Sequence, residues 1–520
     1  MEYEDSLRKV VKGAGVILIG TVIAKILTFV YNILIARIGA EIYGLFSISL
    51  AILNLIVTLA IIGLDTGIVR YISHYNGKNE ASKVKGTINL ALDIVIINSI
   101  IFLILLLVLA DKISIYLFHD QNLAFFLKMI AFAIPTTLIS VIFLRVLRSY
   151  LYTKYETYIK LIFESFSKVL FLVIFFALGL KIFGIVMAYN LALFGTLILS
   201  WYFYKKKISP ILKNIKTVYP SKKELINYSL PLIFNEIAIP LVLWIDTFMI
   251  SYFLDSASTG IYNVVVLIVL LMGLIPYSLM YLVLPILTEF YSQNKKNTFS
   301  LLYKTCTKWI FALNLVVFFL FLLISKEFLD LFFGIEYVKD ALTIFNVSIP
   351  ISVLILWILL IGFLAFYTLS CSKDILIIFK KTRYIALNTV IVAIFDIFLN
   401  LYLIPILGIV GAAIATSISL IIGAILIGVE AHIVSGMNIF KINYIKIFFS
   451  AVLSSLIIFL SKSLFNFEGI VSLIIYPIIF ILLYLLFLII TKSLEREDMF
   501  VIKLLKRNFF RKVNELRNLP

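Results

Sequence analysis

Four polar residues recur along the first long apolar segment of the chain. Thr21, Lys25, Thr28 and Asn32 are spaced so that an α-helix carries all four on one face. A lysine inside an apolar segment of membrane length costs several kcal/mol unless it is hydrated or paired. We therefore expect this face to line a wet substrate cavity that suits an anionic group. The alternative interpretation is a buried ion pair with another segment.

The seventh apolar segment carries acidic and amide groups where the first carries a cation. Asn235, Glu236 and Asp246 lie in it, and two prolines interrupt its helix. A proline leaves a backbone carbonyl without its helical partner, which is tolerated beside protein or water and allows the helix to bend. We assign the three side chains to the same substrate cavity and expect Asp246 to be the natural ion-pair partner of Lys25.

Other polar residues within the apolar segments give weaker signals. Asp396 and Asn400 lie four residues apart in the eleventh segment, and we assign them to the cavity as well. Glu164 and Lys168 are four apart in the fifth, in the order that favours an ion pair within one helix, so they either satisfy each other or face the cavity. Three more charged residues have the same two alternatives but lie nearer the ends of segments, where snorkelling to water is cheap: Lys128, Asp65 and Asp93.

No catalytic pattern accompanies these residues. The sequence contains no Walker loop, His-Glu-x-x-His pair or nucleophile elbow in a suitable setting. Its 3 histidines are scattered and its 2 cysteines offer no disulfide framework, so no metal centre is expected. We predict that the chain is not an enzyme and has no cofactor, with coupling to Na⁺ or H⁺ left open.

The composition is that of an integral membrane protein. Hydrophobic residues make up 63% of the chain and charged residues 14%, and the mean hydropathy is +1.12. Apolar runs of about 20 residues, the length that crosses the hydrocarbon core as a helix, recur throughout, and they lack the alternation of membrane β-barrels. We predict fourteen transmembrane helices, at 13–36, 44–64, 87–110, 123–144, 158–180, 184–204, 226–253, 260–285, 303–325, 342–368, 384–404, 407–431, 444–464 and 469–490.

Basic residues concentrate on one side of these predicted helices. Of the 45 lysines and arginines, 36 lie in or beside alternate connections, beginning with the N-terminus, and 6 in or beside the others. Because cytoplasmic loops are rich in lysine and arginine, both termini are expected in the cytoplasm. The same rule accounts for the net charge of +17 without a nucleic-acid partner.

The chain is duplicated. Three short segments recur 224, 215 and 219 residues later: Phe183–Val186, Pro135 and Ile42–Gly44. Six spans per copy is an even number, so both copies share one orientation and are expected to form parallel bundles about a pseudo-two-fold axis, a typical transporter plan with the substrate path between the halves. The predicted parts are an N-terminal six-helix bundle at 1–204, a basic cytoplasmic linker at 205–224, a C-terminal six-helix bundle at 225–435, two additional transmembrane helices at 436–490, and a basic amphipathic cytoplasmic tail at 491–520.

Four shorter segments are expected at the membrane surfaces. The linker and the tail are basic, so we expect them to contact anionic headgroups, the tail as an interfacial helix in preference to a solvated chain. Two outer connections hold Ile113–Phe118 and Phe328–Phe333, which we interpret as short amphipathic helices lying on the outer surface.

Three stretches of sequence resemble the polysaccharide-transporter branch of the multidrug/oligosaccharidyl-lipid/polysaccharide (MOP) exporter superfamily, which includes Wzx-type flippases. They are Ala36–Phe46 (ARIGAEIYGLF), Trp244–Ile250 (WIDTFMI) and Gly408–Thr416 (GIVGAAIAT). The resemblance covers nearly the whole chain. It implies an all-α, MATE-like fold, but these scaffold motifs do not identify a sugar.

By this resemblance, the chain is expected to move a polyprenyl-(di)phosphate-linked oligosaccharide from the cytoplasmic to the outer leaflet of the plasma membrane, by alternating access. Glycosyltransferases or a polymerase of the same pathway are then its possible partners. In related flippases, basic residues of the first span line the cavity and the last two spans help to form a groove for the lipid tail. By position, the equivalents here are Lys25 and residues 444–490.

Two other interpretations remain open. A multidrug exporter driven by Na⁺ or H⁺ belongs to the same superfamily, but many of those use an acidic residue in the first span, where this chain has Lys25 and no carboxylate before Glu41. Those exporters also usually have twelve spans. The second alternative is a membrane scaffold for a glycan-assembly complex that transports nothing. The charged residues within the spans argue against it, because they cost stability and a scaffold that transports nothing has no use for them.

Overall fold

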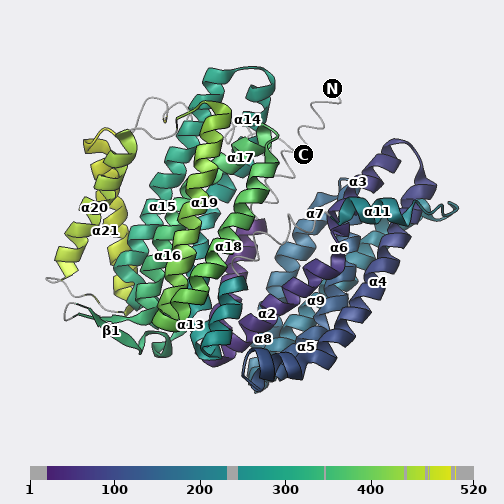
Figure 1. The fold of residues 1–520 in the computed structure, drawn as a ribbon, viewed down its shortest axis with the longest axis horizontal. Coiled ribbons are helices and arrows are strands. Elements are labelled where there is room, and N and C mark those ends of the chain that lie inside the picture. The colour runs from purple at the N-terminus through teal and green to yellow at the C-terminus, as the bar shows by residue number, and fades with distance from the viewer. Residues whose placement is uncertain are drawn as a thin grey trace, which may run out of the picture. The chain divides into compact units, whose positions relative to one another are not determined.

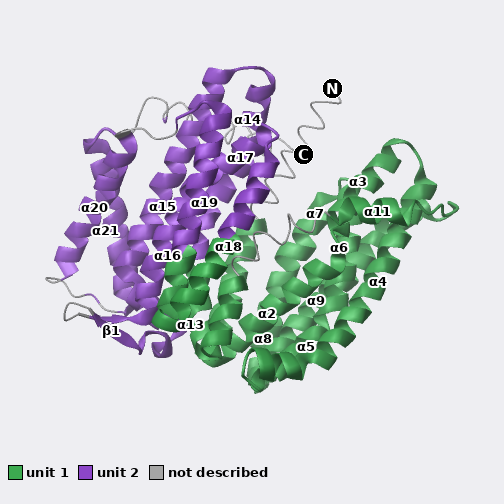
Figure 2. Cartoon of the chain, viewed as in Figure 1, with its two compact units in different colours: residues 1–268, 393–416 green, residues 269–392, 417–520 purple. Residues whose placement is uncertain are grey.

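A computed structural model of the chain describes residues 20–230, 244–344, 347–438, 442–462, 467, 469–493 and 498. The chain forms two compact units, residues 1–268 with 393–416 and residues 269–392 with 417–520. They are called unit 1 and unit 2, and Figure 2 draws them in green and purple. The predicted boundaries at 204, 224 and 435 follow the sequence repeat and remain predictions.

Unit 1 is a bundle of apolar helices (Figure 1). It begins with the helix Gly20–Ala36 and contains helical residues 244–253, together with parts of α18 (Thr382–Leu407) and α19 (Ile409–Ser435). Its other elements are α2 (Ala40–Ile61), α3 (Leu64–Gly77), α4 (Ala81–Lys112) with the π-helical turn Ile113–Leu117, α5 (Asn122–Ala131), α6 (Ala133–Ser149), α7 (Thr153–Glu156), the π-helical segment Thr157–Phe163, α8 (Glu164–Ala177), α9 (Lys181–Lys207), α10 (Ser209–Leu212), α11 (Lys222–Ser229) and α13 (Ser256–Val269).

Unit 2 contains the remaining long helices and one β-hairpin. The hairpin pairs β1 (Ala341–Ile344) with β2 (Val347–Pro350) in antiparallel register, with Ala341 opposite Pro350. The other elements are the 3₁₀ turn Leu270–Gly273, α14 (Leu274–Ser292), α15 (Lys296–Phe333), the 3₁₀ turn Ile335–Val338, α16 (Ile351–Thr368), α17 (Ser370–Ile378), the remainders of α18 and α19, α20 (Ile442–Lys462) and α21 (Gly469–Ile490).

Eleven helices among the described residues are long and apolar enough to cross a membrane, and they coincide with eleven of the fourteen predicted spans. The first predicted span, 13–36, includes the apolar helix Gly20–Ala36, and its residues 13–19 lie outside the described part of the chain. The fifth is one run of helix through 153–177 with a π-helical stretch, and the seventh falls partly on 231–243, outside the described residues. Side chains on outward faces are themselves apolar, as lipid requires, among them Ile97, Val108 and Phe398. The chain is a multi-pass membrane protein.

Three expectations about surface segments and span ends differ from the structure. The segments 113–118 and 328–333 were expected as separate surface helices, but α4 runs directly into the π-helical turn and α15 continues to Phe333. The helix α15 ends at Gly334, whose φ of 106° is accessible to glycine at little cost. The tenth span was expected from residue 342, but Pro350 caps α16 and the apolar residues before it pair as the hairpin.

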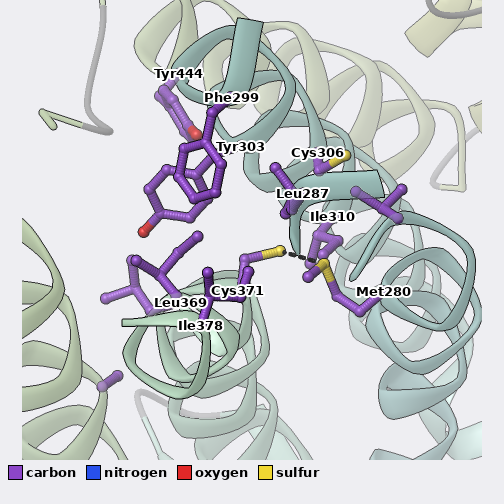
Figure 3. Packing of buried hydrophobic residues seen from close by; sticks show 13 residues of the cluster. Met280, Leu287, Phe299, Tyr303, Cys306, Ile310, Leu369, Cys371, Ile378 and Tyr444 are labelled. Carbon is purple, nitrogen blue, oxygen red and sulfur yellow. Dashed lines mark hydrogen bonds between the residues drawn. The ribbon is translucent and has the colours of Figure 1, made fainter. Parts of the chain in front are cut away.

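The core of unit 2 lies between α14, α15 and α17. Figure 3 shows Phe299 beside Tyr303 on one side of this cluster and Cys371 facing Met280 on the other, with 3.1 Å between the two sulfur atoms. The Tyr303 hydroxyl is 2.8 Å from the Ser372 hydroxyl. A second apolar cluster joins α15 to α20 and α21, which lie beside it in Figure 1, through Phe319, Phe480 and other side chains. The last two helices are thus packed onto α15 along their length.

Two glycines in unit 1 allow the backbones of α2 and α13 to touch. A Cβ on Gly44 would overlap the Ser256 carbonyl oxygen, and a Cβ on Gly260 would overlap the Ala40 carbonyl oxygen. The two contacts are reciprocal: Gly260 takes the role of Gly44 and Ser256 that of Ala40, an offset of 216 residues in both cases, as a pseudo-two-fold relation between these helices requires. The repeated Ile-Tyr pair is related by a different offset in the sequence, 219 residues. The two offsets differ by three residues, which is close to one helical turn.

The predicted linker is docked against unit 1. The Val218 amide donates to the Ser82 carbonyl over 3.1 Å, and the Lys85 ammonium donates to the Ile215 carbonyl over 2.9 Å. After this contact, the Ser221 side chain caps α11 by accepting from the Glu224 amide. Apart from its first three residues and Asp498, the predicted amphipathic tail at 491–520 lies outside the described residues.

Candidate functional site

A cluster of buried polar side chains forms around Asp246 in unit 1. Its carboxylate accepts hydrogen bonds from the Tyr262 hydroxyl at 2.7 Å, the Thr416 hydroxyl at 2.6 Å and the Asn400 amide at 2.9 Å. The Asn400 amide also donates to Asp396 at 3.2 Å. The helical segment 244–253, α13, α18 and α19 each supply at least one of these residues. All five are almost completely buried.

Two carboxylates bridged by one amide are unusual at this depth in a membrane protein. Asn400 Oδ1 accepts no hydrogen bond from the described part of the chain, so the side chain that bridges the two carboxylates through its Nδ2 also has a buried oxygen with free lone pairs. Carboxylate, amide and hydroxyl oxygens are the ligands of small hard cations. The cluster, which we call the Asp246 site, therefore has the donor set for a proton or a cation such as Na⁺.

The first helix carries the predicted polar face, but Lys25 does not reach Asp246. Lys25 and Thr28 are exposed, whereas Asn32 donates to the Thr28 carbonyl at 2.7 Å and accepts from the Tyr43 hydroxyl at 3.1 Å. Thr21 is partly buried on the same helix. The expected ion pair between Lys25 and Asp246 is wrong, because uncharged donors already surround the carboxylate.

The remaining sequence-predicted residues are dispersed. Lys128 forms an ion pair of 2.7 Å with Asp111, and Asp93 is exposed on α4. Asp65 is buried and lies 3.4 Å from an Arg145 nitrogen. Asn235 and Glu236 fall outside the described residues. The structure therefore brings Asp246, Asp396 and Asn400 together, and leaves Lys128, Asp93 and Asp65 away from them.

In the fifth predicted span, Glu164 binds two lysines. The Lys168 ammonium is 2.8 Å from one carboxylate oxygen, and the Lys160 ammonium is 2.7 Å from the other. Lys168 also lies over the ring of Tyr189, 4.4 Å from its centroid. The structure contains the Glu164–Lys168 pair that the spacing suggests and adds a second cation to it.

Sequence reasoning missed three of the residues in these two clusters. Lys160 was counted with the basic cytoplasmic connection, although its i, i+4, i+8 spacing with Glu164 and Lys168 was a usable signal. In the sequence, Tyr262 and Thr416 stand out only as members of the repeated and family-like segments. A hydroxyl in such a segment gives no indication in sequence that it faces a buried carboxylate.

Comparison with known proteins gives one family and one fold. The model of the polysaccharide biosynthesis protein family matches residues 10–291. A structure of the lipid II flippase MurJ, in an inward closed conformation, is 18% identical with a TM-score of 0.72, and the match covers 92% of this chain and 99% of that chain. None of the curated proteins matches the chain significantly.

Two multidrug transporters have the same fold. An inward-facing MATE family transporter of the MOP superfamily is 14% identical with a TM-score of 0.66, covering 81% of this chain and 98% of that chain. A variant of the Vibrio cholerae MATE transporter VcmN is also 14% identical, with a TM-score of 0.57 and coverages of 84% and 98%. At these identities the likenesses establish the fold, which is the predicted all-α, MATE-like one.

Proposed function

Because the chain belongs to the polysaccharide biosynthesis protein family, we propose that it is a flippase for lipid-linked oligosaccharides. It moves a polyprenyl-(di)phosphate-linked oligosaccharide from the cytoplasmic to the outer leaflet of the plasma membrane, for surface polysaccharide or glycoprotein assembly, with both termini in the cytoplasm. The sugar and phosphate groups pass through a polar cavity by alternating access while the polyprenyl tail stays in lipid. Glycosyltransferases or a polymerase of the same pathway supply or consume the substrate.

The observation that carries the proposal is the exposed cation on the first helix. Lys25 lies within the helix Gly20–Ala36, is exposed, and forms no ion pair with any residue in the described part of the chain. A lysine held in an apolar helix without a counter-charge is stable only where water or an anionic ligand reaches it. A diphosphate is such a ligand, whereas a cationic drug would be repelled.

The Asp246 site supports cation coupling of the same transport. Its carboxylates can take up H⁺ or Na⁺. Two of its four helical segments, 244–253 and α13, precede the stretch 269–392 of unit 2 in the sequence, and the other two, in α18 and α19, follow it. A cation bound there would change how α18 and α19 sit against α13. The same site keeps a cation-driven multidrug exporter as the second candidate function, because such exporters also need a buried carboxylate.

A reconstituted transport assay tests the proposal. Proteoliposomes containing fluorescent lipid-linked oligosaccharide are expected to expose it to an added outside glycosidase at a rate that depends on the protein. Lys25→Ala is expected to slow that exposure at least about tenfold while the protein still folds, because one charge-assisted hydrogen bond to a phosphate contributes about 1.5–3 kcal/mol.

Ile26→Ala is the matched control, since Ile26 is exposed on the same helix and is not part of its polar face. If Lys25→Ala transports at the wild-type rate, the assignment of Lys25 to the substrate path is wrong. Efflux of a cationic dye that depends on Asp246, without transport of the lipid, would replace the flippase with the multidrug exporter.

A further inference from the structure

One carboxylate in the fifth predicted span serves two lysines, which leaves this stretch of membrane helix with a net positive charge. Glu164 accepts from Lys160 at 2.7 Å and from Lys168 at 2.8 Å, each through a different oxygen. Glu164 is the only acidic residue on α8, and the helix Gly20–Ala36 and α9 contain none. Glu156, one turn before Lys160, is instead paired with Arg145 at 2.9 Å. Among the described residues, the two lysines therefore share Glu164 as their counter-charge.

The charges are layered, with the cations outermost. The side chain of Glu164 is 8% exposed, whereas Lys168 is 17% exposed and Lys160 is 33% exposed. Each ammonium has three donor hydrogens and spends one on Glu164. The remaining donor hydrogens are not used by Glu164, so the part of this cluster that is exposed is cationic and can donate further hydrogen bonds.

Local structure fixes both lysines in place. The π-helical segment Thr157–Phe163 interrupts the regular helix before Glu164, and π-helical turns frequently lie at functional sites. Lys168 rests on the Tyr189 ring, which meets Phe46 edge to face at 5.9 Å between centroids. An ammonium already oriented by a carboxylate and an aromatic ring loses little freedom when a ligand binds.

The same cluster adjoins the helix that carries Lys25. A Cβ on Gly20 would overlap the Thr157 side chain, so the start of the first helix touches the π-helical segment directly. The Tyr31 hydroxyl, further along that helix, lies 3.5 Å from the Ile185 carbonyl of α9. Three lysines therefore lie on two neighbouring helices of unit 1.

We propose that Lys160 and Lys168 form a binding site for the diphosphate group of a lipid-linked substrate, with Glu164 as a resident counter-ion that the diphosphate displaces. The proposal rests on the proposed function. The charge distribution assigns this part of the fifth span to the cytoplasmic half of the membrane, which is the side from which the substrate enters. The two ammonium groups that converge on this one carboxylate match two adjacent phosphates in charge, and Lys25 receives the group next along the path.

Binding of farnesyl diphosphate to the purified, full-length protein tests the site. The wild type is expected to bind it, and K160Q/K168Q is expected to bind at least about tenfold more weakly, because it loses two charge-assisted contacts. E164Q is expected to bind several-fold more tightly, since no counter-ion then competes for the lysines. A purely structural ion cluster would not produce that gain.

A triple variant protects the test against misfolding. K160Q/K168Q leaves Glu164 buried without its cations, which can prevent folding, whereas K160Q/E164Q/K168Q removes all three charges together. The triple variant is expected to fold and to bind farnesyl diphosphate at least about tenfold more weakly. K128Q is the matched control, because Lys128 has its own partner in Asp111, and its affinity is expected to stay at the wild-type value.

Three binding results and one transport result would overturn the inference. One is a triple variant that binds farnesyl diphosphate as tightly as the wild type. Another is inorganic pyrophosphate binding as tightly as farnesyl diphosphate, which would make a free diphosphate the ligand. The third is equal binding of vesicles of phosphatidylglycerol, which would make the cluster a general anionic-lipid contact. A triple variant that still transports lipid-linked oligosaccharide normally defeats the inference alone, whereas absence of transport by the wild type defeats the proposed function.

Discussion

Replacing Gly44 with alanine is expected to push α2 and α13 apart where their backbones touch. The new methyl group would overlap the Ser256 carbonyl oxygen, and this backbone atom cannot rotate away as a side chain can. The helices must separate, which weakens the van der Waals contacts on both sides of the crossing. Overpacking of this kind costs about 1–3 kcal/mol, partly offset by up to about 1 kcal/mol that alanine gains over glycine in a helix.

Gly77→Ala provides the reference for that estimate. Gly77 is the last residue of α3 and has nothing within 4 Å of the position that a Cβ would take. Its substitution is expected to leave stability unchanged or slightly raised. The difference between the two variants in detergent, followed by the intrinsic fluorescence of the 4 tryptophans during heating, is expected to correspond to the overpacking cost of about 1–3 kcal/mol.

The reciprocal contact allows a stricter version of the experiment. Gly260→Ala is expected to cost as much as Gly44→Ala, because its methyl group would meet the Ala40 carbonyl oxygen in the symmetry-related position. The double variant is expected to cost less than the sum of the two, since one separation of the helices makes room for both methyl groups. If the Gly44→Ala protein is as stable as the Gly77→Ala protein, the backbones of α2 and α13 do not cross closely at Gly44. If the double variant loses the sum of the two single losses of stability, the contacts at Gly44 and Gly260 are independent and not reciprocal.

Two further substitutions address the buried charges. Asp498→Ala is expected to lower the unfolding temperature, because Asp498 accepts a hydrogen bond from the buried ammonium of Lys308 at 2.6 Å and breaking a buried ion pair costs up to about 3–5 kcal/mol. Glu336→Ala is the control and is expected to leave the unfolding temperature unchanged, because Glu336 lies on an exposed turn. Equal unfolding temperatures for the two variants would contradict a stabilising ion pair between Lys308 and Asp498. Asp246→Asn is expected to abolish any dependence of transport on a Na⁺ or H⁺ gradient, and transport rates that still follow the gradient would show that the coupling site is elsewhere.

The sequence was informative wherever a long apolar run had to cross the membrane. Each such run has both the length and the composition of a span, and eleven of them reappear as described helices of suitable length. The ends were harder to predict, because composition does not separate a span from an apolar segment that leaves the membrane. The predicted tenth span begins at 342, yet Ala341–Ile344 and Val347–Pro350 pair as the two strands of a hairpin, and the helix begins only after Pro350.

The members of the candidate site could be found from sequence, but their partners could not. Asp246 stood out because a carboxylate in an apolar segment needs compensation. Its compensation comes from Tyr262, Asn400 and Thr416, on three other helices and up to 170 residues away. Pairing with Lys25 is the simplest assumption by charge alone, and it fails because three neutral donors already occupy the oxygens of the Asp246 carboxylate.

The two repeats share a scaffold but differ in the charged residues that their first helices carry. The helices α2 and α13 keep a reciprocal contact, while the first helix carries an exposed Lys25 and the segment 244–253 carries a buried Asp246. A duplicated scaffold with differing charges suits a substrate that is itself asymmetric, with a charged group, sugars and an apolar tail.

The most direct test measures two substrates in the same proteoliposomes. Wild-type protein is expected to move a fluorescent lipid-linked oligosaccharide to the leaflet where an added glycosidase can cleave it, and to leave a cationic dye in the lumen under either a Na⁺ or an H⁺ gradient. Protein that expels the dye and leaves the lipid inaccessible to the glycosidase would contradict the account.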